Sequence, residues 1–456
     1  MRKQKRFDMM LLTVSVIIAV MAVIAVSVRY ASKGSAGGDI YTEAGVITDT
    51  VITTELLVTT EAPVTEPVET DEVTEYVTDP PVTTELVTEP ATEPVTEAPE
   101  ASEDKIISVL ACGDNLLYRP NTFEADELSI DGKRSYMFTY ERIAEFLGSA
   151  DISFINQETL LCGGNSGYPL FNSPFEVADT LSELGFDVAN IATNHMLDVG
   201  YDGALNSTGE GIEISRSTLE NAGLTVIGGY LNEDDFNNVR ILERDGVRIA
   251  FLAFTESTNT ITLYDNSEIY IPYLTEENVI AAVSVARKVA DVIIVSAHWG
   301  VDSSSRLSDS QLYFAKLFAD LGVDAVIGHH SHIVHPIEWI EGKDGNRMLC
   351  AYSLGNLIGI MEYPLTVLGG ILTFDIRVAD GEKPVVENVG FVPTVYNYDK
   401  HYRNNKIYFL EDYTDEMAAE HGVCKVYDHE FTVDDLTDHI KNTVNEVFIR
   451  SINDYR

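Results

Sequence analysis

Residues 324–336 read "DAVIGHHSHIVHP", an apolar run that follows an aspartate and ends in a cluster of histidines. Four of the ten histidines of the chain fall within seven positions here. A short apolar run bounded by polar residues predicts a buried β-strand. This strand would carry its histidines to its carboxyl end.

The same arrangement recurs along the chain. A helix-like segment, an aspartate, an apolar run and polar residues follow one another in "SADISFINQE" (149–158), "GFDVANIATNH" (185–195) and "VADVIIVSAHWG" (289–300). Two further runs, 105–114 and 347–356, also end in polar residues, whereas the run 247–255 shows no such ending. Apolar runs that alternate with amphipathic segments predict an α/β fold. In such a sheet the carboxyl ends of the strands form a crevice, so these side chains should converge.

The side chains at the predicted strand ends are typical ligands of a divalent metal. As ligands we expect Asp114, Glu158, Asn194, His298, His330 and His332. Imidazole, carboxylate and amide oxygen together favour Zn²⁺, Mn²⁺ or Fe²⁺ over Ca²⁺. A carboxylate such as Glu158 can bridge two ions about 3.5–4 Å apart, so we expect one or two ions.

Three polar residues of the same stretches are candidates for a direct part in catalysis: Asn194, His195 and His329. A metal pair lowers the pKa of a bound water toward about 7 and so supplies a nucleophile. Asn194 or His195 can then neutralise developing charge, and an outer histidine such as His329 can protonate a leaving group. If the backbone stays extended, His330 and His332 share one face and His329 points away.

Each candidate also has a purely structural interpretation. Asp114 can cap a turn or a helix start, and Asn194 can occupy a left-handed turn position. An isolated histidine such as His298 is often a core residue. We expect His335, which precedes a proline, to be structural.

The N-terminal region predicts a membrane anchor. Residues 1–8 are basic, and residues 9–28 are apolar and uncharged. Twenty helical residues at about 1.5 Å each span about 30 Å, the thickness of a bilayer core. The basic flank predicts a cytoplasmic N-terminus and an extracytoplasmic body, so we expect a single-pass protein of the cell membrane. A cleaved signal peptide is the alternative.

The remaining chain divides by composition. Residues 29–104 form an acidic tract rich in Thr, Glu and Pro, which predicts a disordered linker. We expect an α/β domain at 105–380 and a C-terminal extension at 381–456 that packs on it. The formal net charge of −43 excludes nucleic acid as a natural partner.

Six motifs in this order resemble the CapA family of bacterial poly-γ-glutamate capsule synthesis proteins. They are "CGDNLL" (112–117), "INQETL" (155–160), "IATNHMLDVGYDG" (191–203), "SAHWGVD" (296–302), "FADLGVDAVIGHHSHIVHPIE" (318–338) and "AYSLGNLIG" (351–359). The resemblance implies a metallophosphatase-like sandwich of two sheets flanked by helices, outside the membrane. It also implies a role in making, exporting or anchoring an anionic polymer, and it gives the same ligand positions, with His195 among them.

Three functions are compatible with these observations. The first is an anchored CapA-like protein with a metal-dependent hydrolase-like site that acts on a capsule or cell-envelope polymer. The second is an extracellular metallophosphoesterase unrelated to capsule. The third is a non-catalytic scaffold that binds the polymer or the membrane subunits of its synthase. Because the chain is so acidic, direct binding of polyglutamate would need divalent cations or a local basic strip.

Overall fold

Two mixed β-sheets form the framework of the computed structural model, which describes residues 104–198, 207–379 and 381–455. The first sheet contains, in spatial order, β14 (Lys406–Phe409), β13 (Val385–Asn397), β12 (Leu368–Val378), β1 (Lys105–Asn115), β2 (Ile152–Gln157), β3 (Val188–Asn190) and β4 (Thr225–Ile227), with β11 (Asn356–Ile358) paired to β1. The second contains β5 (Arg240–Arg244), β6 (Val247–Thr255), β7 (Val292–His298), β8 (Ala325–His329), β10 (Arg347–Ala351) and β9 (Ile337–Glu341).

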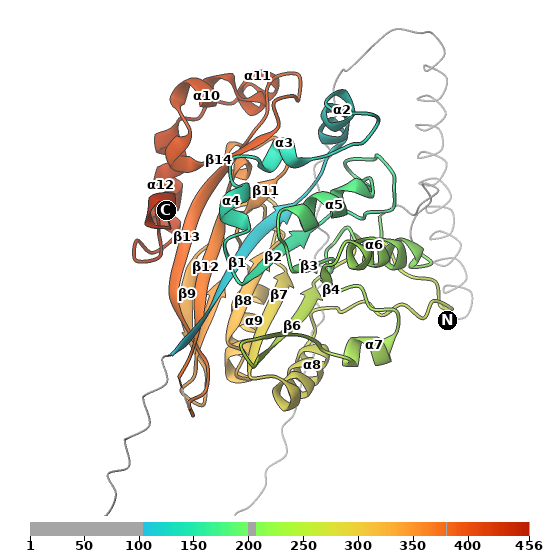
Figure 1. Ribbon diagram of the computed structural model, residues 1–456, viewed down its shortest axis with the longest axis vertical. Coiled ribbons are helices and arrows are strands. Elements are labelled where there is room, and N and C mark those ends of the chain that lie inside the picture. Colours follow the sequence, from blue (N-terminus) through green and yellow to red (C-terminus); the bar gives the residue numbers. More distant parts are fainter. Residues whose placement is uncertain (1–103, 199–206, 380, 456) are drawn as a thin grey trace, which may run out of the picture. The chain divides into compact units, whose positions relative to one another are not determined.

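Helices follow most of the parallel strands (Figure 1). The α-helices are α2 (Arg119–Glu127), α3 (Met137–Tyr140), α4 (Ala144–Leu147), α5 (Glu176–Glu183), α6 (Glu210–Asn221), α7 (Glu233–Asn237), α8 (Glu276–Val289), α9 (Asp309–Asp320), α10 (Asp415–Glu420), α11 (Gly422–Tyr427) and α12 (Val433–Thr443). Three short 3₁₀ helices are η1 (Pro364–Val367), η2 (Leu410–Asp412) and η3 (Ile452–Asp454).

The alternation of side chains along β6 shows how the layers are built. Ile249 and Phe251 join the core that also contains the strands of the first sheet, whereas Ala250 and Leu252 join a second core with Phe318 of α9. Successive residues of a strand point to opposite faces, so the second sheet is buried on both sides. One face meets the first sheet and the other is covered by α8 and α9. The predicted α/β class is confirmed.

Parallel pairing brings the predicted strand ends together. In the first sheet Asp114 of β1 is in register with Asn156 of β2 and with Asn356 of β11. In the second sheet His298 of β7 is in register with His329 of β8. Because parallel strands end at the same edge, each sheet presents a row of polar side chains there, as the sequence predicted.

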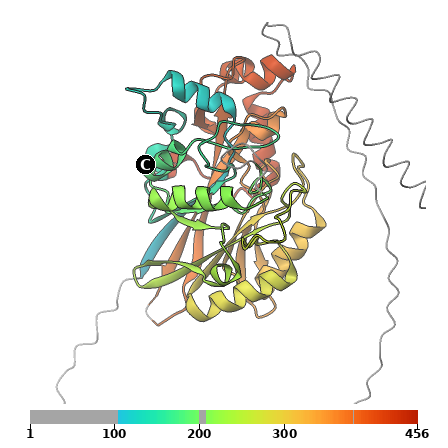
Figure 2. The same cartoon turned by 90° about the vertical axis from the view of Figure 1, so that its right-hand side faces the viewer.

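The structure differs from the predicted organisation after residue 380. Strands β13 and β14 lie in the segment set apart as an extension, yet they pair with β12 and with each other in the first sheet. In both views the red helices α10 and α11 lie at the same end of the domain as α2 (Figures 1 and 2). The C-terminal segment therefore contributes strands to the first sheet and helices that lie at the same end of the domain as α2.

The predicted membrane anchor at 9–28 and almost all of the predicted linker at 29–104 lie outside the described residues. Among the helices that the structure does describe, none combines the length and the apolarity that a bilayer crossing requires.

Candidate metal centre

Asp114, at the end of β1 in the first sheet, contacts residues that follow β8 of the second sheet. It is completely buried, and its Oδ1 accepts a hydrogen bond from Asn156 Nδ2 at 2.8 Å. Its Oδ2 lies 3.0 Å from His332 Nδ1 and accepts the backbone N–H of His330 at 3.3 Å. His329 Nδ1 lies 3.5 Å from Oδ1. The carboxylate of the first sheet therefore contacts the histidine segment that follows β8 of the second.

A chain of amides holds this carboxylate in place. Asn190 Nδ2 donates to Asn156 Oδ1 at 2.7 Å, and Asn156 in turn donates to Asp114. Asn190 Oδ1 accepts the backbone N–H of Ala192 at 3.0 Å. The three side chains come from β3, β2 and β1, which are adjacent parallel strands. The register of the sheet thus sets the orientation of Asp114.

Glu158 lies one residue beyond β2 and faces three histidines. It is 1% exposed, and neither of its side-chain oxygens has a hydrogen-bond partner within the described part of the chain. Its Oε1 is 3.7 Å from Nε2 of His298, 3.7 Å from Nε2 of His332 and 4.0 Å from Nε2 of His195. A buried carboxylate without hydrogen bonds is costly, so an ion or water is expected between these atoms.

The histidines after β8 do not follow the strand alternation expected for an extended backbone. His330 and His332 have φ of 87° and 57°, in the left-handed region that side-chain-bearing residues rarely adopt. Both rings consequently turn toward the centre. His329 does not point away, because its ring approaches Asp114 and stacks on Phe154 with centroids 5.8 Å apart. Strain of this kind is concentrated at functional sites.

Asn194, which follows β3 of the first sheet, contacts His298 of β7 in the second sheet. His298 Nε2 lies 2.8 Å from Asn194 Oδ1, and both residues are buried. Asn194 Nδ2 donates to Asn259 Oδ1 at 3.2 Å. The amide of Asn194 is thus oriented with its oxygen toward the histidines.

His195 is oriented by Asp198, as a positioning carboxylate would do. His195 Nδ1 lies 2.7 Å from Asp198 Oδ2, which also accepts the backbone N–H of Phe171 at 2.7 Å. The ring packs edge-on against Phe171 with centroids 4.7 Å apart. With Nδ1–H donated to the carboxylate, Nε2 keeps its lone pair and faces Glu158.

The electrostatics of the cluster favour added positive charge. Burial raises the pKa of Glu158 well above its ordinary value, and the charge of Asp114 raises it further. Burial would lower the pKa of His332, but Glu158 and Asp114 outweigh it and raise the pKa to about 10. Both Glu158 and His332 therefore hold a proton more tightly than usual beside Asp114. A divalent cation at this place would supply the positive charge that these protons supply.

Two overlapping groups of side chains have the geometry to hold an ion. One contains Asp114, Glu158 and His332, and the other contains Glu158, His298 and His330. Within each group the ligand atoms lie within 4.8 Å of one another. His330 Nδ1 is buried and has no hydrogen-bond partner among the described residues. Glu158 is common to both groups, so the residues fit one ion or a bridged pair.

Burial keeps His298 and His330 neutral. It lowers the pKa of His330 to about 4, with a further decrease from the charge of His332. It also lowers the pKa of His298 well below the ordinary value. Neutral imidazole is the form that binds a metal.

Two residues that shape the centre, Asn190 and Asn259, were not predicted from the sequence. Asn190 lies in the apolar run of β3. A polar amide within a buried apolar run could have indicated its role. Asn259 follows β6, whose run 247–255 was taken to lack a polar ending. It has φ of 50° and its Nδ2 lies 3.4 Å from His195 Nδ1. Asn259 stands four positions after the end of β6, and this position was overlooked.

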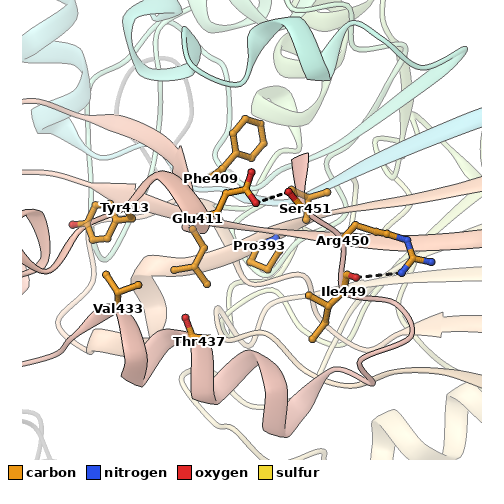
Figure 3. Close-up of a pocket in the computed structure, with 11 residues that line it drawn as sticks. Pro393, Phe409, Glu411, Tyr413, Val433, Thr437, Ile449, Arg450 and Ser451 are labelled. Atoms are coloured by element: carbon orange, nitrogen blue, oxygen red, sulfur yellow. Dashed lines mark hydrogen bonds between the residues drawn. The ribbon is translucent and has the colours of Figure 1, made fainter. Parts of the chain in front are cut away.

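A separate pocket of about 350 Å³ lies among β13, η2, α12 and the C-terminal residues (Figure 3). Its charged groups are paired internally. Ser451 Oγ donates to Glu411 Oε2 at 2.6 Å, and Arg450 Nη1 donates to the carbonyl of Ile449 at 3.2 Å. None of the candidate ligands lies in its wall, so this pocket is not part of the centre.

Residues 108–360, more than half of the chain, match the family "Bacterial capsule synthesis protein PGA_cap". The chain is 32% identical over 192 residues to the PGA biosynthesis protein CapA of Bacillus subtilis (strain 168), covering 40% of this chain and 45% of that protein. It is 26% identical over 206 residues to the capsule biosynthesis protein CapA of Bacillus anthracis, covering 44% and 47%. The chain therefore spans about half the length of these curated relatives.

Among solved structures, the calcineurin-like phosphoesterase YfkN from Bacillus subtilis aligns with 75% of this chain and 97% of its own. The identity is 13% and the TM-score 0.39, which is a weak likeness. The extent of the family match, which includes every candidate ligand, is decisive: the chain belongs to the PGA_cap family of bacterial capsule synthesis proteins.

Proposed function

We propose that this chain is a membrane-anchored, extracytoplasmic protein of capsule or cell-envelope polymer biosynthesis, with a metal-dependent hydrolase-like centre in a metallophosphatase-like domain. Membership of the family and the names of the Bacillus relatives support the biosynthetic role. The apolar segment at 9–28 supports the anchor. The polymer and the membrane subunits of its synthase are the proposed partners.

The pair of unpartnered oxygens of Glu158 carries the catalytic part of this proposal. A structural carboxylate at 1% exposure would have hydrogen-bond donors, but Glu158 has none among the described residues. Its Oε1 lies 3.7 Å from Nε2 of His298 and of His332, which can themselves bind a cation. We assign one ion site to Asp114, Glu158 and His332 and the other to Glu158, His298 and His330. The donor set suits Zn²⁺, Mn²⁺ or Fe²⁺.

A bound divalent pair supplies an activated water and polarises a phosphoryl or carbonyl oxygen. The chain's own residues orient the reacting groups. Asp198 fixes the tautomer of His195 so that Nε2 can accept a proton on the side of Glu158. His329 is fully buried, whereas His195 keeps 8% of its surface exposed, so the proton-transfer role falls to His195.

Metal content is the direct test. The full chain is purified, reconstituted with Zn²⁺, Mn²⁺ or Fe²⁺, and analysed for bound metal beside a His330→Ala/His332→Ala double variant. We expect one or two ions per chain in the wild type and their loss in the double variant. His401→Ala, which removes an exposed histidine, should keep the metal.

Circular dichroism would establish that the double variant is folded. Absence of bound metal in the folded, reconstituted wild type would refute the hydrolase-like centre and favour a scaffold. Retention of the full metal content by the double variant would refute the assignment of these two ligands.

A further inference from the structure

Asn356, the first residue of β11, lies beside the candidate metal centre but belongs to neither of the two groups proposed to hold an ion. β11 pairs with β1 in parallel, and Asn356 stands in register with Asp114. The backbone N–H of Asp114 donates to the carbonyl of Gly355 at 3.0 Å. Asn356 is completely buried. Strand pairing thus carries an uncharged amide to the edge of the centre.

The amide of Asn356 contacts one ring nitrogen of His332. This histidine belongs to the group of Asp114, Glu158 and His332, which we call the His332 site. His332 Nδ1 lies 3.0 Å from Asn356 Oδ1 and 3.0 Å from Asp114 Oδ2. The other ring nitrogen, Nε2, lies 3.7 Å from Glu158 Oε1, which has no hydrogen-bond partner among the described residues. The two nitrogens of the ring therefore face different surroundings.

The orientation of the Asn356 amide is set by its other neighbours. Its Nδ2 donates to the carbonyl of Thr366 at 2.8 Å and lies 3.5 Å from the sulfur of Met361. A backbone carbonyl only accepts hydrogen bonds, so the NH₂ group of the amide has to face Thr366. The amide oxygen then faces His332. Because this oxygen cannot donate, Nδ1 of His332 has to carry the hydrogen of the bond between them.

Two glycines allow the backbone to pack directly against Asn356. A Cβ at Gly359 would lie 2.8 Å from Asn356 Nδ2, and a Cβ at Gly369 would lie 2.0 Å from the carbonyl oxygen of Asn356. Both distances are shorter than a Cβ can approach another heavy atom. Close packing of this kind holds a buried side chain in one rotamer. The amide is therefore in place before an ion binds.

We propose that Asn356 is a positioning residue for the ion of the His332 site: its amide oxygen keeps a hydrogen on Nδ1 of His332 and so presents Nε2 to the ion. This inference rests on the proposed function, because it concerns a ligand of the proposed centre. Metal-binding histidines almost always donate their second ring N–H to an oxygen, which fixes the orientation of the ring. Among the described residues, the side-chain hydrogen bonds of Asn356 reach none of the histidines of the other proposed site. Its effect should therefore be confined to one ion.

Zinc affinity measures this effect without any need for turnover. The full chain and Asn356→Leu are titrated with Zn²⁺ against a chromophoric chelator, which gives the dissociation constant of each bound ion. We expect the dissociation constant of one ion to rise about 10–100-fold in the variant, the usual loss when the partner of a metal-binding histidine is removed. Asn356→Ala, which removes the amide without introducing a larger side chain, should show the same loss. Unchanged affinity for every bound ion would overturn the inference.

Asn405→Leu is the matched control for the loss of a buried amide. Asn405 is also completely buried, its Nδ2 donates to the carbonyl of Tyr402 at 3.0 Å, and its Oδ1 accepts from Tyr396 OH at 2.6 Å. These bonds involve no candidate ligand. The control should lower the free energy of unfolding, as Asn356→Leu does, but leave zinc affinity unchanged. An equal loss of zinc affinity in both variants would mean that general destabilisation is the cause, and the positioning role would fail.

A double-mutant cycle tests whether Asn356 acts through His332. The cycle adds His332→Ala and its combination with Asn356→Leu to the two proteins already titrated. Once His332 is alanine, Asn356→Leu should change zinc affinity by less than about twofold, which is the accuracy with which independent effects add. A full 10–100-fold loss in that background would overturn the inference. A wild-type chain that binds no zinc would instead overturn the proposed function, so the two failures are distinguishable.

Discussion

Two buried polar clusters in this domain differ in how their polar atoms are satisfied. One is the candidate metal centre. The other, which we call the α2 network, joins α2 to β13, to the loop after it and to the junction of α10 and α11. It consists of Asn121, Glu124, Tyr396, Asn405 and His421. All five of its members are at most 8% exposed, so the two clusters are similarly buried.

The α2 network is hydrogen-bonded throughout. Glu124 accepts the backbone N–H groups of Asn404 at 2.9 Å and Asn405 at 3.1 Å, and also the Asn405 amide. Tyr396 OH accepts from Asn121 and donates to Asn405 Oδ1, both at 2.6 Å. In the centre, by contrast, Glu158 has no hydrogen-bond donor among the described residues. Burial alone therefore does not distinguish a structural cluster from a functional one, whereas hydrogen-bond satisfaction does.

The largest expected difference between the clusters is in the response of their glutamates to an isosteric change. Glu124→Gln turns an amide toward backbone donors and should lower the free energy of unfolding by about 3 kcal/mol or more, because buried donors lose their acceptor. Glu158→Gln replaces a carboxylate that has no hydrogen-bond donor among the described residues, and His332 beside it keeps Asp114 as its partner. It should change stability by less than about 1 kcal/mol.

Urea denaturation of both variants in the presence of a chelator measures this difference. A large loss in Glu158→Gln under these conditions would mean that the carboxylate has a structural partner, and the contrast between the clusters would fail.

A second difference concerns histidine protonation. In the α2 network His421 Nε2–H donates to the carbonyl of Tyr396 and Nδ1 accepts the N–H of Val423, both at 3.0 Å. Burial lowers its pKa to about 4, although the bond to Tyr396 opposes this. The unfolded chain therefore binds the proton more readily, and stability falls as pH decreases from 6.5 to 4. By pH 5 the loss is about 2 kcal/mol.

Comparing the wild type with His421→Gln isolates this contribution, because glutamine offers an acceptor and a donor without titrating. The difference in unfolding free energy between the two proteins should change by about 2 kcal/mol between pH 7 and pH 5. A difference that is independent of pH would show that His421 is not held neutral by the fold.

Much of the fold followed from the sequence because buried strands leave a strong local pattern. The apolar runs at 105–114, 149–158 and 289–300 became β1, β2 and β7, and their polar endings predicted where the side chains of Asp114 and His298 would converge. The pairing of β13 with β12, and of β14 with β13, could not be predicted in the same way. Antiparallel pairing of distant strands depends on tertiary contacts that local composition does not encode.

The structure brings several of the predicted site residues together, but their geometry was not predicted. Asp114, Glu158 and His332 were identified from their positions after apolar runs, and the structure brings them together. The conformation of His330 was not foreseen, because the strand alternation assumed an extended backbone. A left-handed backbone at a histidine is imposed by its surroundings, here the contact of its N–H with Asp114, and not by its own preference.

Backbone strain is the remaining feature that could distinguish the clusters, and it occurs in the centre and at a residue that contacts the α2 network. His332 has φ of 57° in the centre, and Tyr402, whose carbonyl accepts the Asn405 amide at 3.0 Å, has φ of 56°. At each position a glycine variant should be more stable than the alanine variant by about 1 kcal/mol, since only alanine keeps the strain. At His329, a β8 strand residue, alanine should be the more stable by about 0.5–1 kcal/mol.

Equal gains at positions 332 and 402, measured by urea denaturation without metal, would mean that strain marks tight packing in general. The unpartnered oxygens of Glu158 would then be the property that separates the candidate metal centre from the α2 network. A gain at position 332 alone would add backbone strain to the features of the centre.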